Sequence, residues 1–310
     1  MNSISNTSAL GRALSYLAAA ALSAGVLAAA PTARAQVEAP VDGTVIPNAP
    51  PAREQTYETA RGIGMGMGGR ASAMGTSAAA YNAANLTLAP LYHIETLVGF
   101  IPSQRTWIYG GAIADSVSSR LAMGISWYGY RGNEERDASG YDGRLSLGMA
   151  LTRAIGVGVS GRFIKLNPGL RHFTLDASLR GTLFKGLNVA ALGYNLIRTD
   201  SPIAPLMVGG SVGYTYEQLF SINVDALADL TTFDDPEAIL GVGAEVFAGG
   251  SVSLRVGYRR EFGRDLNQFT ASLGYVTAKV GVDIALRQDV GPVQQTRDSQ
   301  LALTLRYQVQ

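Results

Sequence analysis

The sequence predicts an all-β protein: a closed antiparallel transmembrane β-barrel of about 14 strands, with an N-terminal hatch (plug) segment in the lumen. Three observations predict this fold class. Apolar and polar residues alternate in strand-length segments from Tyr92 onward, and tight turns alternate with longer polar loops. The mean hydropathy is positive, at +0.12, although no stretch beyond the first 35 residues is long and apolar enough for a spanning helix.

The N-terminal residues have the features of a secretory signal peptide. Arg12 supplies a positive start, an alanine-rich apolar stretch follows, and Ala33-Arg34-Ala35 forms a small-x-small cleavage site. The alternative, a retained membrane anchor, fits the alanine content and the cleavage site less well. The expected organisation is a signal peptide at 1–35, a leader and hatch at 36–90, and an outer-membrane barrel at 91–310.

The composition fits an exported membrane barrel and excludes several kinds of chemistry. Only 16% of residues are charged, against roughly 25% in soluble domains. The net charge of +1 gives no field that would favour nucleic acid. Cysteine is absent and His93 and His172 are the only histidines, so we expect neither thiolate chemistry, nor a metal site, nor a cofactor.

The alternation is plainest in the last segment, where Leu301, Leu303 and Leu305 fall on one side and Thr304 and Arg306 on the other. An arginine that faces lipid near the midplane costs about 2 to 4 kcal/mol, so the polar sides should line the lumen. We interpret the lumen-facing charges as pairs of opposite sign that neutralise one another across neighbouring strands, and we favour this over a dedicated ligand site. The predicted lumen-facing charges are Arg144, Arg162, Asp176, Arg180, Asp225, Glu245, Arg255, Arg259, Asp283 and Arg287.

The connections between the predicted strands alternate in length. Tight turns such as "TRA" at 152 and "FKG" at 184 alternate with longer loops such as "KLNPGLR" at 165–171. Short periplasmic turns and longer outer loops are expected of outer-membrane barrels, whereas a soluble β-sandwich, the alternative, has no reason to keep this pattern. Aromatic residues near strand ends fit an interfacial girdle: Trp107, Tyr109, Trp127, Tyr214, Tyr216, Tyr258 and Tyr307.

The glycine-rich stretch at 61–70, "RGIGMGMGGR", formally fits a dinucleotide-binding fingerprint. No strand precedes it and no acidic residue follows at the required distance, so that interpretation is disfavoured. Fourteen strands enclose a lumen too wide for side chains alone to fill. Because glycine permits close backbone contact and methionine fills uneven gaps, we expect this segment to fold back into the lumen, with an apolar pocket near Met65, Met67 and Met74.

Two stretches resemble the FadL-like superfamily, which includes long-chain fatty acid transporters and PorV-type proteins. The family's hatch carries an R-x-x-G-M-G-G-A run and then an aromatic residue with Asn-Pro-Ala-Gly-Leu. Arg61 and Gly64-Met65-Gly66 match the first part, and Tyr81-Asn82, Ala84 and Leu86 match the second. Ala83 and Asn85 replace the family's proline and glycine. Asp176, Gly186, Gly193, Asn195 and Leu196 match a second family stretch, a strand, a tight turn and the next strand.

The resemblance implies a hatched outer-membrane barrel, not an enzyme, that takes up small hydrophobic compounds such as fatty acids. Outer-membrane lipid and a hydrophobic small molecule would then be its partners. The hatch and ligand-path residues would be Gly64, Met65, Gly66, Met67, Met74, Tyr81 and Asn82. The alternative is a non-transporting scaffold or shuttle for surface proteins, with a protein partner.

A hydrolase is a further alternative, because His172, Asp176 and Ser178 share strand parity. Residues two apart on a strand lie about 7 Å apart, too far for a nucleophile, base and orienting group to meet. We therefore expect no catalytic residues.

Overall fold

The computed structural model describes residues 59–66, 68–132, 139–166, 170–199, 204–217, 219–291 and 298–309. A boundary after Pro47 separates residues 1–47 from a second unit, Asn48–Gln310. The expected signal peptide, the leader up to residue 58 and Met67 lie outside the described residues. The description below concerns the second unit.

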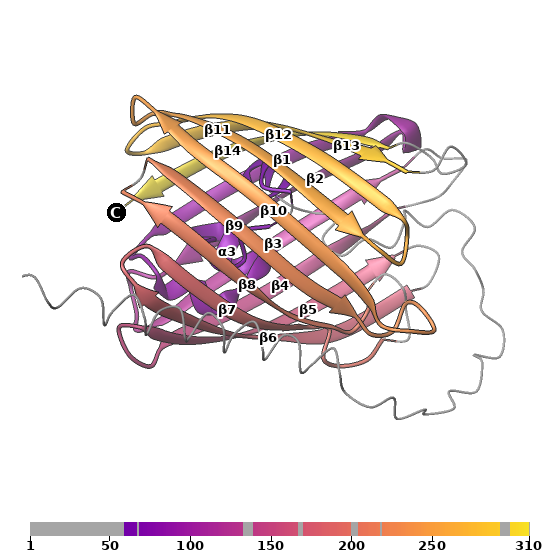
Figure 1. Ribbon diagram of the computed structural model, residues 1–310, viewed down its shortest axis with the longest axis horizontal. Helices are drawn as coiled ribbons and strands as arrows, with labels where there is room; N and C mark the ends of the chain where they lie inside the picture. Colours follow the sequence, from indigo (N-terminus) through magenta and orange to yellow (C-terminus); the bar gives the residue numbers. More distant parts are fainter. Residues whose placement is uncertain are drawn as a thin grey trace, which may run out of the picture. The chain divides into compact units, whose positions relative to one another are not determined.

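Fourteen antiparallel strands form a closed barrel in which each strand pairs with its sequence neighbours and β1 pairs with β14 (Figure 1). The predicted barrel is thereby confirmed. The strands are β1 Tyr92–Ile101, β2 Thr106–Asp115, β3 Leu121–Arg131, β4 Ser139–Ala150, β5 Ile155–Leu166, β6 Leu170–Phe184, β7 Leu187–Tyr194, β8 Met207–Tyr216, β9 Phe220–Asp229, β10 Glu237–Ala248, β11 Val252–Glu261, β12 Leu266–Val276, β13 Val280–Val290 and β14 Ser299–Val309.

Side chains alternate between an apolar exterior and a polar interior along the strands. In β14, Leu301, Leu303 and Leu305 are 40–50% exposed, whereas Gln300 and Thr304 are each 1% exposed. Closure pairs every strand on both edges, which a sheet needs in hydrocarbon because water cannot satisfy unpaired backbone groups there. Within the described part of the chain, no helix is long and apolar enough to cross a membrane.

Short turns gather at the end of the barrel where the chain leaves β14, and the longer connections lie at the opposite end, the long-loop end (Figure 1). The predicted loop at 165–171 is too long. The structure continues β5 to Leu166 and begins β6 at Leu170, with Lys165 paired opposite Arg171. The loop residues Lys165 and Arg171 keep the two-residue alternation, so the ladder extends through them.

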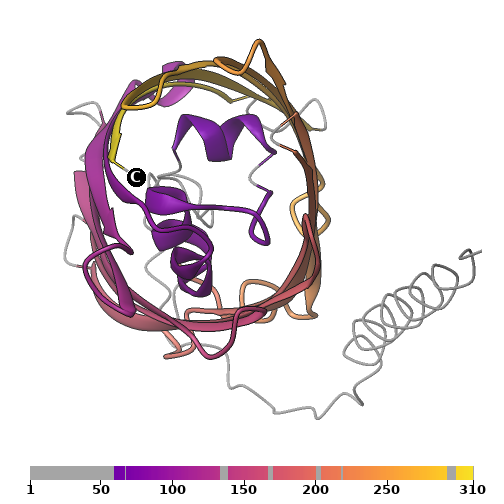
Figure 2. The ribbon, with the colours of Figure 1, turned by 90° about the vertical axis from the view of Figure 1, so that its left-hand side faces the viewer.

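Residues 59–66 and 68–88, the luminal segment, lie inside the ring of strands (Figure 2). The segment contains helix α2 (Ala60–Gly64), helix α3 (Gly75–Tyr81) and the 3₁₀ helix η1 (Ala83–Thr87). Its hydrogen bonds reach nine strands, namely β1, β4, β6, β7, β8, β9, β10, β12 and β14. A second 3₁₀ helix, η2 (Pro102–Gln104), connects β1 to β2.

Candidate functional site

A single arginine fastens the middle of the luminal segment to the barrel wall. Arg70 is 2% exposed, and its Nη1 lies 2.8 Å from a carboxylate oxygen of Asp225 in β9. Its Nε donates to the Tyr194 hydroxyl in β7 at 3.0 Å, and that hydroxyl donates to the Tyr81 carbonyl at 2.5 Å. The guanidinium also lies 5.9 and 5.7 Å from the Tyr81 and Tyr194 ring centroids. Arg70 therefore joins two strands to two parts of the luminal segment.

Two asparagines complete this junction from within the segment. The side-chain amides of Asn82 and Asn85 both donate to the Arg70 carbonyl, at 2.8 and 2.9 Å. Asn85 stands where the resembling family carries glycine, and a glycine could not make this hydrogen bond. The predicted site residues Tyr81 and Asn82 thus have structural contacts here. Sequence reasoning did not single out Arg70, and it noted Asn85 only as a departure from the family pattern.

A second anchor holds the start of the segment. Arg61 in α2 lies 2.8 Å from Glu245 of β10, which also pairs with Arg255 of β11 at 2.6 Å. Arg255 continues to Asp283 of β13 at 2.7 Å, and Asp283 also pairs with Arg306 of β14. Burial acts to lower the pKa of Arg61, but the charge of Glu245, its hydrogen bond and the charge of Asp283 act together against this, and the pKa is raised above its usual value. This network joins the segment to four strands.

Glycines in the strands leave space where the segment touches the wall. A Cβ on Gly257 of β11 would lie 2.1 Å from the Gly66 nitrogen, and one on Gly243 of β10 would lie 2.4 Å from the Met65 carbonyl oxygen. On the other side, a Cβ on Gly158 of β5 would lie 2.2 Å from the Ala84 nitrogen. These gaps are far below any real contact distance, so the wall accepts the segment only because these positions lack side chains.

The remaining predicted lumen-facing charges lie on the inner faces of the strands with polar partners. Arg162 pairs with Asp142 at 2.5 Å, and Arg144 lies 3.7 Å from Asp176. Arg180 donates to the Thr87 hydroxyl of the segment at 3.3 Å. Near the long-loop end, two more pairs join arginine to an acid two residues along the same strand: Arg259–Glu261 at 3.0 Å and Arg287–Asp289 at 3.2 Å.

The other predicted ligand-path residues lie against different parts of the wall. Gly64 and Gly66 are buried, and Thr270 of β12 contacts both, accepting from the Gly66 nitrogen at 3.0 Å and donating to the Gly64 carbonyl at 3.2 Å. Met65 is 1% exposed beside β10, whereas Met74 is 46% exposed and precedes α3, whose Thr76 nitrogen donates to His93 of β1. The structure does not bring Met65 and Met74 together, and Met67 lies outside the described residues.

Two small cavities lie beside the segment, and Ala80, Tyr81 and Arg144 border both. Each has room for roughly one water molecule. The residues of the hydrolase alternative have other partners here: Asp176 accepts from the Asn195 nitrogen at 2.8 Å, and Ser178 accepts from the Ala84 nitrogen at 3.1 Å.

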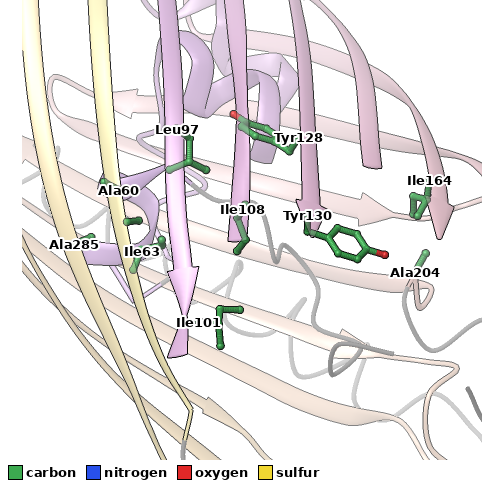
Figure 3. Packing of buried hydrophobic residues seen from close by; sticks show 11 residues of the cluster. Ala60, Ile63, Leu97, Ile101, Ile108, Tyr128, Tyr130, Ile164, Ala204 and Ala285 are labelled. Carbon is green, nitrogen blue, oxygen red and sulfur yellow. The ribbon is translucent and has the colours of Figure 1, made fainter. Parts of the chain in front are cut away.

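Apolar side chains cover one side of the interior between the segment and the long-loop end (Figure 3). This apolar inner wall consists of Leu97, Ile101, Ile108, Tyr128, Tyr130 and Ile164, from β1, β2, β3 and β5, all at most 4% exposed. Ile63 of α2 belongs to the same cluster. Sequence reasoning missed the wall. The sequence feature that could have predicted this wall is the β1 run "YHIETLVGFI", which is apolar on both faces toward its end.

The fold is therefore a closed antiparallel barrel of fourteen strands with an N-terminal segment in its interior. No family model matches the sequence, and no curated protein matches it. Solved structures do match. The CymD monoaromatic hydrocarbon channel has a TM-score of 0.59 at 11% identity, with 81% of this chain and 97% of that chain covered.

Two further structures have the same fold. The Ralstonia pickettii toluene transporter TbuX gives a TM-score of 0.56 at 13% identity, covering 82% of this chain and 99% of that chain. A Pseudomonas aeruginosa FadL homologue gives a TM-score of 0.55 at 11% identity, covering 81% of this chain and 98% of that chain. The expected FadL-like fold is confirmed. Together with the apolar exterior, this fold supports a location in the outer membrane.

Proposed function

We propose that this protein is an outer-membrane transport barrel for the passive uptake of small hydrophobic compounds, with the luminal segment as its hatch. The apolar inner wall carries the proposal. Barrels that conduct water and polar solutes have polar interiors, because water must wet the channel. Here the interior next to the segment presents leucine, isoleucine and tyrosine instead.

Apolar pockets with few polar groups are the usual sites for hydrophobic ligands. A compound that enters from the long-loop end would meet the apolar inner wall before it meets Ile63 and the luminal segment (Figure 3). The similar structures whose titles name a hydrocarbon channel and a toluene transporter add support for hydrocarbon-like cargo.

The experiment measures binding of toluene and of a long-chain fatty acid to purified protein, and uptake of both by cells. Ile108→Asn places an amide in the apolar inner wall, where Ile108 is 0% exposed. An unpaired buried polar group costs about 1–3 kcal/mol, so we expect affinity and uptake to fall about 10-fold.

Ile108→Leu is the matched control, because it keeps an apolar side chain of similar volume and should retain uptake within about threefold. Heat-dependent mobility on a denaturing gel confirms that each variant folds. If wild-type protein binds neither compound and its deletion causes no uptake defect, the proposed function is wrong.

A further inference from the structure

We propose that the exterior of β2–β6 at the long-loop end binds the phosphate groups of the phosphorylated glycolipid in the outer leaflet. Four cations, the rim cations, lie at this edge: Arg105, Arg131, Lys165 and Arg171. All are exposed except Lys165, which is half-buried. This site faces lipid and is separate from the lumen, so it does not depend on what the barrel transports.

Strand parity places these side chains outside. Arg131 pairs opposite Trp107, which is 53% exposed on the exterior. Lys165 lies two residues beyond Phe163, and Arg171 two residues before Phe173, both of which are exposed exterior residues. Arg105 sits immediately before β2 in a left-handed conformation, with φ of 48°, at the same edge.

The strand pairing places two positive charges side by side. Lys165 and Arg171 are directly opposite in the β5–β6 register, and like charges in that position are destabilising. Among the described residues, no carboxylate forms an ion pair with any rim cation. Arg260 of β11 provides the contrast, because it is an exterior cation near the same end of the barrel and pairs with Asp265.

The chemistry of the site matches a phosphate monoester. Such a group carries about −1.5 to −2 charges, which two cations side by side would neutralise. Arginine binds phosphate through two parallel N–H donors, and lysine binds it as a point charge. Free phosphate shares this chemistry, but the surroundings of the site favour a lipid.

Aromatic residues continue from the rim cations toward the membrane interior. The rings of Tyr109, Trp127, Tyr141 and Phe163 follow one another across β2–β5 with centroid separations of 5.9, 6.3 and 6.1 Å. The Lys165 Nζ lies 5.6 Å from the Tyr141 ring centroid. Such rings occupy the level between headgroups and acyl chains, so the cations next to them lie at the headgroup level.

The test compares wild-type protein with the double variant Lys165→Gln/Arg171→Gln and with the control Arg260→Gln. Native mass spectrometry of protein in mild detergent measures binding of diphosphorylated lipid A and of the same lipid after phosphatase treatment. We expect wild type and Arg260→Gln to bind the phosphorylated lipid within twofold of each other. The double variant should bind it at least 10-fold more weakly, and the dephosphorylated lipid should bind weakly to all three.

Equal binding by wild type and the double variant would overturn the proposal. Equal binding of phosphorylated and dephosphorylated lipid would also overturn it. Inorganic phosphate is the remaining probe. If millimolar phosphate displaces the lipid completely, the site recognises the free anion, and the glycolipid assignment is wrong.

Discussion

At the scale of the residue, Arg70 shows why the luminal segment needs a buried charge. Its guanidinium pairs with Asp225, donates to Tyr194 and contacts the Tyr81 ring at the same time. The planar guanidinium has donors on several edges and can make all three contacts, whereas the ammonium group of a lysine cannot. Such a buried pair adds little net stability over an apolar packing, but removing one partner leaves an uncompensated charge. The value of the pair is that it fixes one position of the segment.

Asp225→Asn should therefore strongly destabilise the protein. The variant leaves Arg70 buried without its counterion, and we expect the free energy of unfolding to fall by about 3–5 kcal/mol. Urea denaturation of the protein reconstituted in lipid, followed by gel mobility, measures this loss. Asp235→Asn is the control, because Asp235 is exposed in the β9–β10 connection. Equal stability of the two variants would contradict the role assigned to Arg70.

At the scale of the element, the segment and the wall fit because glycines occur on both sides of the contact. Gly66 has a φ of 67°, and the strand glycine Gly257 lies against its nitrogen. The glycines of the segment could be singled out from the sequence, because they cluster within residues 61–70. The wall glycines could not, because a glycine in a strand has no distinctive pattern until its partner, here about 190 residues away in the chain, is placed beside it.

Gly257→Ala should displace the segment without breaking the barrel. The added Cβ would lie 2.1 Å from the Gly66 nitrogen, so the segment must move away from β11. Gly143→Ala is the matched control, because a Cβ there meets nothing nearer than 4.0 Å. Limited trypsin digestion with mass spectrometry should detect cleavage after Arg70 at least about fivefold faster in Gly257→Ala than in Gly143→Ala, since Arg70 is 2% exposed when seated. Equal cleavage rates would mean that this contact does not hold the segment.

At the scale of the whole molecule, the barrel was predictable and its interior largely was not. A two-residue period sorts every strand into two faces, and closure follows from the need to pair all edges in hydrocarbon. The same period identifies the inward charges but says nothing about which residues meet across the lumen. Arg61 reaches Glu245, 184 residues away, and the apolar inner wall gathers four strands. Such contacts depend on strand tilt and on the path of the segment, which no local pattern specifies.

The segment crosses a lumen that side chains alone cannot fill, since eight strands are about the limit for that. Removing residues 36–90 should therefore open a continuous aqueous path. In planar bilayers we expect the intact mature protein to be nearly silent and the deletion variant to show a large, steady conductance.

Deletion of residues 36–58 alone is the control, because it removes none of the residues that make the described contacts of the luminal segment, and it should be as silent as the intact protein. Heat-dependent gel mobility shows that each form is folded before it is measured. If the intact protein and the 36–90 deletion conduct equally, the segment does not close the barrel. If the 36–58 deletion conducts as strongly as the longer one, the closure belongs to the leader, and the anchors at Arg61 and Arg70 serve only to position it.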